Sequence, residues 1–376
     1  MPSADFIMGF LNKLLRRHKH PFMDWIQIEV TSLCGFSCFY CPHTVYRDHW
    51  DHGSMSLETF RSISCNFKMA NLIFLQGWGE PFLNGKIFEM IEIAKNEGSK
   101  VGLTTNGMFL NQETIDALIN LELDILGISL AGTKPENHNR LRAGTDFNQI
   151  TRCLLDLKEK KAQKKSPVPN VHLAYLMLRS NFEDLRDIIK YAKEINSKDI
   201  VCSNLNFFPS PELRNEAIFL DEGKISYYSE ALKSLQSEAK NNAINFFFYN
   251  PVLPERSLSL CPENILKSCF ISQDGLVSSC VFTNIPLLGN AGHPLPKHII
   301  YGDIHQKSLS EIWDLDLYKN FRNIFAARKR SITDIDLVVD INRFQQSHEG
   351  IMNERGNGTL NDLPVQCRRC YRMFGV

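Results

Sequence analysis

Short apolar runs alternate with longer amphipathic stretches over the first two thirds of the chain. Runs with the length and composition of β-strands span residues 25–30, 71–76, 100–105, 124–130, 170–177 and 199–207. Between them, apolar residues recur at helical spacing over residues 57–67, 85–96, 112–121, 146–164 and 181–195. Each interval is long enough for the crossover that joins two parallel strands. The pattern predicts an α/β fold, an incomplete (β/α)6 barrel rather than a doubly wound sheet.

The first 24 residues stand outside this alternation. Apolar side chains recur there at helical spacing, and a basic run follows at residues 16–20. The apolar part is too short and too interrupted to span a bilayer. A basic amphipathic helix can lie on a membrane or cover one end of a barrel. We favour the covering helix and expect no membrane contact.

Composition narrows the class of protein. The 376 residues suffice for a barrel and an accessory domain. Lys plus Arg and Asp plus Glu are equal at 42 each, so the net charge indicates neither nucleic acid nor a strongly charged partner. Eleven cysteines would suit a disulfide-rich secreted protein only in a small chain with a secretory signal, and neither feature is evident. We therefore expect a cytoplasmic protein.

Three cysteines stand at spacings of four and three residues directly after the first predicted strand. Cys34, Cys38 and Cys41 can hold three irons of a cubane cluster, because thiolates are the soft ligands that iron-sulfur clusters require. The fourth iron would have no nearby cysteine and would be open to a small ligand. The alternative is a zinc site with His43 as fourth ligand, although zinc sites usually show paired C-x2-C spacing.

This stretch resembles the C-x3-C-x2-C signature of the radical S-adenosylmethionine (SAM) family, in which an aromatic residue, here Tyr40, precedes the last cysteine. The resemblance implies a 4Fe-4S cluster whose open iron is chelated by SAM. One electron from the cluster would cleave SAM to methionine and a 5′-deoxyadenosyl radical, which would abstract a hydrogen atom from a substrate. The cofactors supply this chemistry, and the protein supplies placement and shielding.

The segment after the second strand resembles the GGE motif of the same family. Residues 77–81 read Gly-Trp-Gly-Glu-Pro, with Trp78 in place of the first glycine of the motif. The resemblance implies that Gly79 and Glu80 contact the SAM amino group. Trp78 adds bulk that the usual motif lacks.

Later strand ends supply further candidates for cofactor binding. Residues 104–107 form a turn on local grounds, and the resemblance puts this turn near the methionyl moiety of SAM. Ser129 resembles the position that hydrogen-bonds the SAM ribose or carboxylate, and Arg142 falls where relatives direct an Arg toward the cofactor. Inward residues of the fifth and sixth strands are candidates for adenine or substrate contacts, with a polar core role as the alternative: His172, Tyr175, Asn204 and Asn206.

Past residue 250 a second set of cysteines appears. Asp274-Gly275 is a hairpin signal, so short strands over 270–273 and 276–279 would bring Cys269 near Cys280. Cys367 and Cys370 form a late C-x2-C pair. Four thiolates can close either an iron-sulfur cluster or a zinc ion, and spacing alone does not choose between them.

The Gly-x4-Cys hairpin, the runs at 301–304 and 308–313 and the late cysteine pair resemble the SPASM and twitch auxiliary-cluster domains. The resemblance implies one auxiliary 4Fe-4S cluster, with the ligands Cys269, Cys280, Cys367 and Cys370. Cys261 is either an alternative ligand or a buried thiol. The connection 326–366, longer than the family's usual one, either helps to choose the substrate or is a passive spacer.

We therefore expect three parts: an N-terminal extension (1–24), a radical SAM partial barrel (25–245) and a SPASM/twitch-like domain (246–376). The enzyme would abstract hydrogen from a peptide or small metabolite and give oxidation or carbon-bond formation, because four cysteines leave the auxiliary cluster no vacant iron to anchor substrate. The alternatives are a redox-neutral epimerase or cofactor maturase, and a non-catalytic iron-sulfur carrier or scaffold. A flavodoxin or ferredoxin-type protein would donate the electron.

Overall fold

The computed structural model describes residues 22–255, 257–258, 260–285, 298–336, 363–368 and 370–376. The predicted N-terminal helix lies outside these residues, as does most of the connection 326–366. Within the described residues, no helix is both long and apolar enough to cross a membrane.

One predominantly parallel sheet organises the described part of the chain. Its strands follow the order β12-β11-β10-β1-β3-β4-β5-β7-β8-β9, and every neighbouring pair from β10 to β9 is parallel. Strands of such sheets are covered on both faces, which explains their nearly continuous apolar runs. The bounds are β1 Met23–Ile28, β3 Ala70–Leu75, β4 Lys100–Thr105, β5 Ile125–Leu130, β7 Asn170–Met177, β8 Asp199–Asn204, β9 Asn245–Phe248, β10 Ser268–Ile271, β11 Leu276–Ser278 and β12 Gly302–Asp303.

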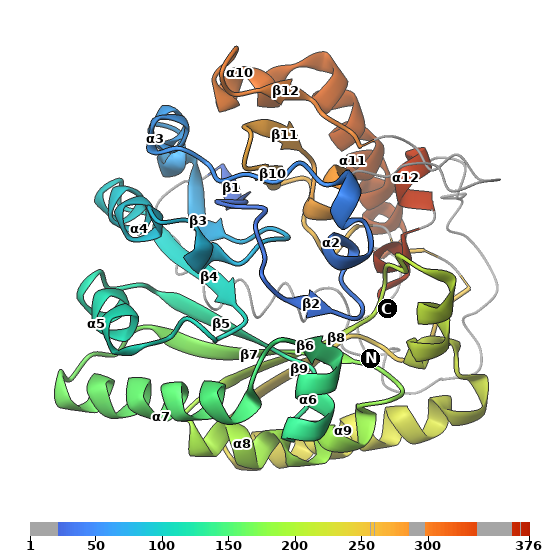
Figure 1. The fold of residues 1–376 in the computed structure, drawn as a ribbon. Helices are drawn as coiled ribbons and strands as arrows, with labels where there is room; N and C mark the ends of the chain where they lie inside the picture. Colours follow the sequence, from blue (N-terminus) through green and yellow to red (C-terminus); the bar gives the residue numbers. More distant parts are fainter. Residues whose placement is uncertain (1–21, 256, 259, 286–297, 337–362, 369) are drawn as a thin grey trace.

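Amphipathic helices lie along the outside of this sheet (Figure 1). Ser56, Asn111 and Asp146 cap three of them by accepting hydrogen bonds from first-turn amides. In α7 the buried residues are three or four positions apart, so one stripe faces the sheet. The bounds are α3 Leu57–Ser64, α4 Ile87–Asn96, α5 Gln112–Asn120, α7 Phe147–Gln163, α8 Ile188–Glu194 and α9 Ile225–Asn241.

Shorter elements complete the fold. Strands β2 (Ser37–Cys38) and β6 (Arg142–Ala143) form a separate antiparallel pair. The predicted helix over 181–195 is divided into a 3-10 helix at Phe182–Asp187 and α8. The remaining α-helices of the described residues are α2 Pro42–Val45, α6 Pro135–Leu141, α10 Leu309–Asp314, α11 Asp316–Asp336 and α12 Val365–Arg368.

The predicted parallel α/β fold is confirmed, but the sheet is larger than six strands. β9 adds a parallel strand beyond β8, and β10 pairs with β1 on the other side. The predicted hairpin, β10–β11, therefore extends the parallel sheet, and the predicted boundary between residues 245 and 246 falls inside β9. Pairing between segments so far apart in the chain leaves no local pattern in the sequence.

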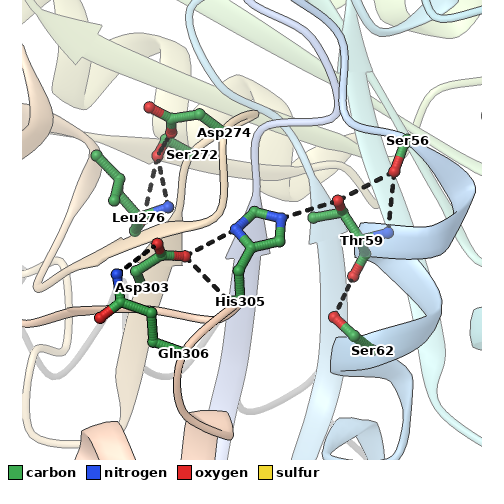
Figure 2. A network of polar contacts seen from close by, with 9 residues as sticks. All are labelled: Ser56, Thr59, Ser62, Ser272, Asp274, Leu276, Asp303, His305 and Gln306. Carbon is green, nitrogen blue, oxygen red and sulfur yellow. Dashed lines mark hydrogen bonds and ion pairs between the residues drawn. The ribbon is translucent and has the colours of Figure 1, made fainter.

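A polar network fastens the hairpin region to the first long helix (Figure 2). Asp303 Oδ1 lies 2.7 Å from His305 Nδ1, and His305 Nε2 lies 3.1 Å from Thr59 Oγ1 on α3. Ser272 contacts Asp274 and accepts a hydrogen bond from Leu276 N inside the hairpin turn. These contacts help to hold the β10–β11 hairpin and β12 next to α3.

Candidate active site

The three N-terminal cysteines gather on the loop between β1 and α2, at the carboxyl end of β1. Burial raises the pKa of Cys34 and raises that of Cys41 to about 12, and Cys38 adds to both shifts. Three thiols close enough to influence one another fit the ligand set of a cluster with one open iron. In the part of the chain that the structure describes, no group of three or more His, Cys, Asp or Glu side chains is compact enough to hold one metal ion.

Tyr40 and Arg142, both predicted near SAM, contact each other. In the β2–β6 pair Cys38 lies opposite Arg142, which brings the Arg142 side chain to the cysteine loop. Arg142 Nη1 donates to the Tyr40 hydroxyl at 2.7 Å. Burial raises the pKa of Tyr40 above its ordinary value, so the hydroxyl stays protonated. Arg142 Nε is buried and has no hydrogen-bond partner among the described residues.

The loop at residues 77–80 lies directly against the backbone that precedes Cys34. A Cβ atom at Gly79 would lie 2.2 Å from Thr31 O, so only glycine permits this approach. Glu80 N donates to Leu33 O at 2.9 Å. The predicted Gly79-Glu80 motif is therefore adjacent to the cysteine loop.

The Glu80 side chain faces the end of β4. Its carboxylate accepts hydrogen bonds from Thr105 Oγ1 at 2.7 Å and from Asn106 N at 2.8 Å. Burial raises the pKa of Glu80 to about 7, and these two hydrogen bonds partly oppose the shift. The side chain is not among those that line the cavity described below. The predicted contact of Glu80 with SAM stays a prediction.

Sequence reasoning missed Glu29, the residue after β1. Its Oε1 accepts from Trp78 N at 2.7 Å, and a Cβ atom at Gly77 would lie 2.3 Å from its Cγ. Burial raises the pKa of Glu29 to about 7, opposed by hydrogen bonds from the Trp78 and Gln273 amides. Glu29 thus connects the loop 77–80 with the turn of the β10–β11 hairpin. The sequence signal that could have identified Glu29 was a carboxylate at the end of an otherwise apolar strand.

A cavity of about 450 Å³ lies beside the cysteine loop. Side chains of β1, β3, β4, β5, β7 and β8 line it, together with Tyr40, Cys41 and Arg142. Most of its wall is apolar, with a few convergent polar groups, as in typical small-molecule sites.

Four of the five predicted strand-end residues line this cavity: Ser129, His172, Asn204 and Asn206. Tyr175 does not, because it points to the helical side of β7, where its hydroxyl donates to Asn181 O at 2.8 Å. Burial lowers the pKa of His172 to about 4, so its imidazole is neutral. His172 Nδ1, Asn204 Oδ1 and Asn206 Nδ2 are buried without a hydrogen-bond partner in the described residues.

The cavity also reaches the C-terminal cysteine region. Arg372 Nη1 pairs with Glu263 Oε1 at 2.8 Å and donates to the Tyr249 hydroxyl at 2.6 Å. The guanidinium lies 5.1 Å from the ring centroids of Tyr249 and Phe282. Phe282 in turn packs edge-on against Trp78, with ring centroids 5.7 Å apart. The loop at 77–80 and the C-terminal region therefore touch.

The structure brings four C-terminal cysteines together: Cys261, Cys280, Cys367 and Cys370. Burial raises the pKa of each thiol, and other members of the group raise those of Cys261, Cys280 and Cys367 further. This donor set fits an iron-sulfur cluster with four cysteine ligands.

Cys269 is not part of that group, in contrast to the predicted ligand set. It is buried on β10, and the charged or titratable groups that it influences are Tyr318 and Arg322 of α11. Cys261, which the sequence left as either an alternative ligand or a buried thiol, lies close enough to Cys280 and Cys370 to influence their group, and the choice between Cys261 and Cys269 as ligand stays a prediction. Side chains alternate across a strand, and a strand covered on both faces does not reveal which face its cysteine occupies.

His43, the fourth ligand of the zinc alternative, packs against aromatic rings. Its ring centroid lies 5.2 Å from that of Trp50 and 5.2 Å from that of His52. Burial lowers the pKa of His43 to about 4, and the charges of His52 and Arg47 add to the shift.

Family and protein comparisons agree with this geometry. Residues 28–192 match the model of the Radical SAM superfamily, and residues 261–335 match SPASM, described as an iron-sulfur cluster-binding domain. The chain is 24% identical over 315 residues to the tungsten-containing aldehyde ferredoxin oxidoreductase cofactor-modifying protein of Pyrococcus furiosus, covering 80% of this chain and 84% of the relative. It is 26% identical over 300 residues to the PqqA peptide cyclase of Ruegeria pomeroyi, covering 76% and 72%.

A solved structure shares the fold. SuiB of Streptococcus suis bound to S-adenosylmethionine matches with a TM-score of 0.61 at 14% identity, covering 86% of this chain and 72% of SuiB. SuiB has also been solved with its precursor peptide SuiA. The matched domains imply a 4Fe-4S cluster, SAM and auxiliary iron-sulfur ligation. The chain therefore has a radical SAM domain over residues 28–192 and a SPASM iron-sulfur domain over residues 261–335, in the same order as its two cysteine groups.

Proposed function

We propose that this enzyme cleaves SAM reductively and abstracts a hydrogen atom from a peptide or small metabolite, giving oxidation or carbon-bond formation. Together the bound cluster and SAM supply an electron and a 5′-deoxyadenosyl radical. The residues that would hold this cluster are Cys34, Cys38 and Cys41. Those that would hold the auxiliary cluster are Cys261, Cys280, Cys367 and Cys370.

The observation that carries this proposal is a cavity shared by both cysteine regions. Tyr40 and Cys41 line one part of it, and Phe282 and Arg372 line another. A substrate bound there would lie between the two regions, so hydrogen abstraction and electron removal could act on the same molecule. The largely apolar wall would exclude water from the reactive centre.

The residues near the cysteine loop would place SAM. Arg142, held by Tyr40, has a free Nε that can donate to a carboxylate, and such charge-assisted hydrogen bonds are strong. Ser129 lines the same cavity and could donate to the ribose. Gly79 and Glu80 would contact the SAM amino group.

The comparisons bear on the substrate. The relatives are named for a peptide cyclase and for cofactor modification, and SuiB has been solved with a peptide. These support a peptide or a cofactor-like metabolite as substrate. A flavodoxin or ferredoxin-type donor would supply the electron, as the radical chemistry requires a reductant.

The test is anaerobic turnover with dithionite and SAM. The reconstituted enzyme should release 5′-deoxyadenosine, whereas a non-catalytic carrier or scaffold would release none. Cys370→Ala should still cleave SAM but give no oxidised product, because its auxiliary cluster lacks a ligand. Full product formation by Cys370→Ala would exclude the electron-accepting role, and a product isomeric with the substrate would favour the redox-neutral alternative.

A further inference from the structure

Two arginines line the cavity in the same manner. Arg142 Nη1 donates to the Tyr40 hydroxyl at 2.7 Å, and Arg372 Nη1 donates to the Tyr249 hydroxyl at 2.6 Å. Resting on the proposed function, we propose that Arg372 is a substrate-binding residue and that the substrate carries a carboxylate or phosphate group.

The free edge of the guanidinium is the first support. Nε and Nη2 of an arginine lie on one edge and can donate two parallel hydrogen bonds to an oxyanion. Arg372 Nη1 contacts Glu263 Oε1 and donates to the Tyr249 hydroxyl. Arg372 Nε is buried with no hydrogen-bond partner among the described residues. Nε, on the Nε–Nη2 edge, is therefore the donor through which this arginine can bind a ligand.

The surroundings of Arg372 hold that edge in place. Its guanidinium lies over the Tyr249 and Phe282 rings, and Glu263 pairs with Nη1. The Arg372 and Glu263 side chains are only 18% and 16% exposed. A rigid, partly desolvated cation binds an anion more strongly than a solvated one does, because less solvent and side-chain entropy is lost on binding.

A purely structural ion pair explains less of this arrangement. A buried ion pair contributes little net stability, because desolvation offsets the attraction between the charges. A structural pair would also gain from using all of its donors, whereas Arg372 leaves Nε unpaired at a cavity wall. An oxyanion in the cavity would satisfy that donor.

We assign the anion that Arg372 would bind to the substrate instead of SAM, because Arg142 would bind the SAM carboxylate. Arg142 lies at the cysteine loop, opposite Cys38 in the β2–β6 pair, and has the same free Nε. Arg372 lies two residues after Cys370, in the auxiliary region. An anion held there would place the rest of the substrate between the two cysteine regions.

The experiment uses three probes that share one ring: benzoate, phenyl phosphate and neutral benzamide. Binding is measured by anaerobic calorimetry on the holoenzyme with oxidised clusters and saturating SAM, so that Arg142 is engaged and no turnover occurs. At least one anion should bind saturably and roughly tenfold or more tighter than benzamide. Preference for benzoate would indicate a carboxylate substrate, and preference for phenyl phosphate a phosphorylated one.

Two variants locate the site. Arg372→Lys keeps the charge but loses the bidentate edge, and it should weaken anion binding roughly tenfold or more while leaving SAM affinity unchanged. Arg214→Lys is the matched control, because Arg214 also donates through Nη1 to a tyrosine hydroxyl, that of Tyr371, but outside the cavity. It should bind both anions as the unaltered enzyme does. If Arg372→Lys does not fold, the charge-balanced double variant Arg372→Gln with Glu263→Gln should show the same loss.

Three results would overturn the proposal: no saturable anion binding, equal binding of benzamide, or undiminished anion binding by the Arg372 variants. These readouts need no catalysis. An enzyme that binds benzoate through Arg372 but forms no 5′-deoxyadenosine would refute the proposed function and keep the anion site. An enzyme that forms 5′-deoxyadenosine but binds neither anion would do the reverse.

Discussion

The two cysteine regions reach similar donor sets by different routes. Cys34, Cys38 and Cys41 come from one loop of eight residues at the end of β1. The C-terminal group comes from three segments: the residues before β10, the end of the β10–β11 hairpin and the last ten residues of the chain. Both regions open on one cavity.

This difference has a physical consequence. The first group depends on one strand end and its adjoining loop, whereas the second forms only when distant segments meet. Closing long loops costs more conformational entropy than closing short ones. We therefore expect the C-terminal group to be the more easily disrupted, and the first group to survive changes in the second.

The largest effect is expected at the first group. Cys38→Ala removes one of its three thiols and should reduce 5′-deoxyadenosine formation by more than about a hundredfold, beyond the usual cost of losing a second-shell partner. Cys65→Ala, which changes an exposed thiol after α3, is the control and should keep full activity. SAM cleavage by Cys38→Ala at the normal rate would show that the loop does not hold the cluster.

Two variants of the second group show whether Cys261 or Cys269 is the fourth ligand of the auxiliary cluster. Cys261→Ala should lose about four irons per chain and the oxidised product, yet keep SAM cleavage. Cys269→Ala should retain its iron, because the Cys269 thiol faces α11 instead of the other cysteines. Iron analysis and electron paramagnetic resonance of the two purified variants show which of the two cysteines binds the cluster. The opposite result would restore the ligand set that the sequence suggested.

An intermediate effect is expected where the loop at 77–80 meets the cysteine loop. Gly79→Ala would place a Cβ atom 2.2 Å from Thr31 O, so the backbone must move. SAM affinity should fall roughly tenfold, the equivalent of about 1.4 kcal/mol. Gly85→Ala is the control, since no atom lies within 4 Å of its added Cβ. Equal SAM dissociation constants for both variants, measured by equilibrium dialysis, would show that this contact does not shape the SAM site.

The last expected effect is on folding stability instead of activity and concerns Glu29, which links the two regions. Its pKa is raised from 4.5 to about 7, so its contribution to stability is present below pH 4.5 and is lost as pH rises through 7. Glu29→Gln removes that loss, because the amide cannot ionise. Relative to the unaltered chain, the variant should gain on the order of 2 to 3 kcal/mol between pH 5 and pH 8.

Thermal unfolding of the holoenzyme at several pH values measures this difference. Glu58→Gln makes the same change from carboxyl to amide at an exposed position on α3 and is the control. A pH-independent difference for Glu29→Gln would mean that Glu29 is not buried as a neutral acid.

Several features of the fold could be predicted from local pattern. Apolar runs and helical periodicity indicated the parallel α/β fold, and Ser56 was recognisable as the cap of α3. The turn at Asp274-Gly275 was predictable because it requires a positive φ, which Gly275 adopts at 86°. These features depend on residues close together in the chain.

Other features depended on contacts between distant segments. Cys261 joins Cys280, Cys367 and Cys370, whereas Cys269 turns to α11. Glu80 turns toward β4, Glu29 supports the loop at 77–80, and Arg372 meets Glu263. None of these follows from spacing, because each depends on strand register and on which face of a buried strand a side chain occupies.

The sequence by itself therefore determined the fold class, the cysteine loop and the presence of a second cysteine set. Local propensity and ligand spacing carry that information directly. Only the tertiary structure decided which thiols of the second set meet and which charged groups face the shared cavity. The pairing of β10 with β1 joins residues 25–28 to residues 268–271, and long-range pairing of this kind has no signature in neighbouring residues.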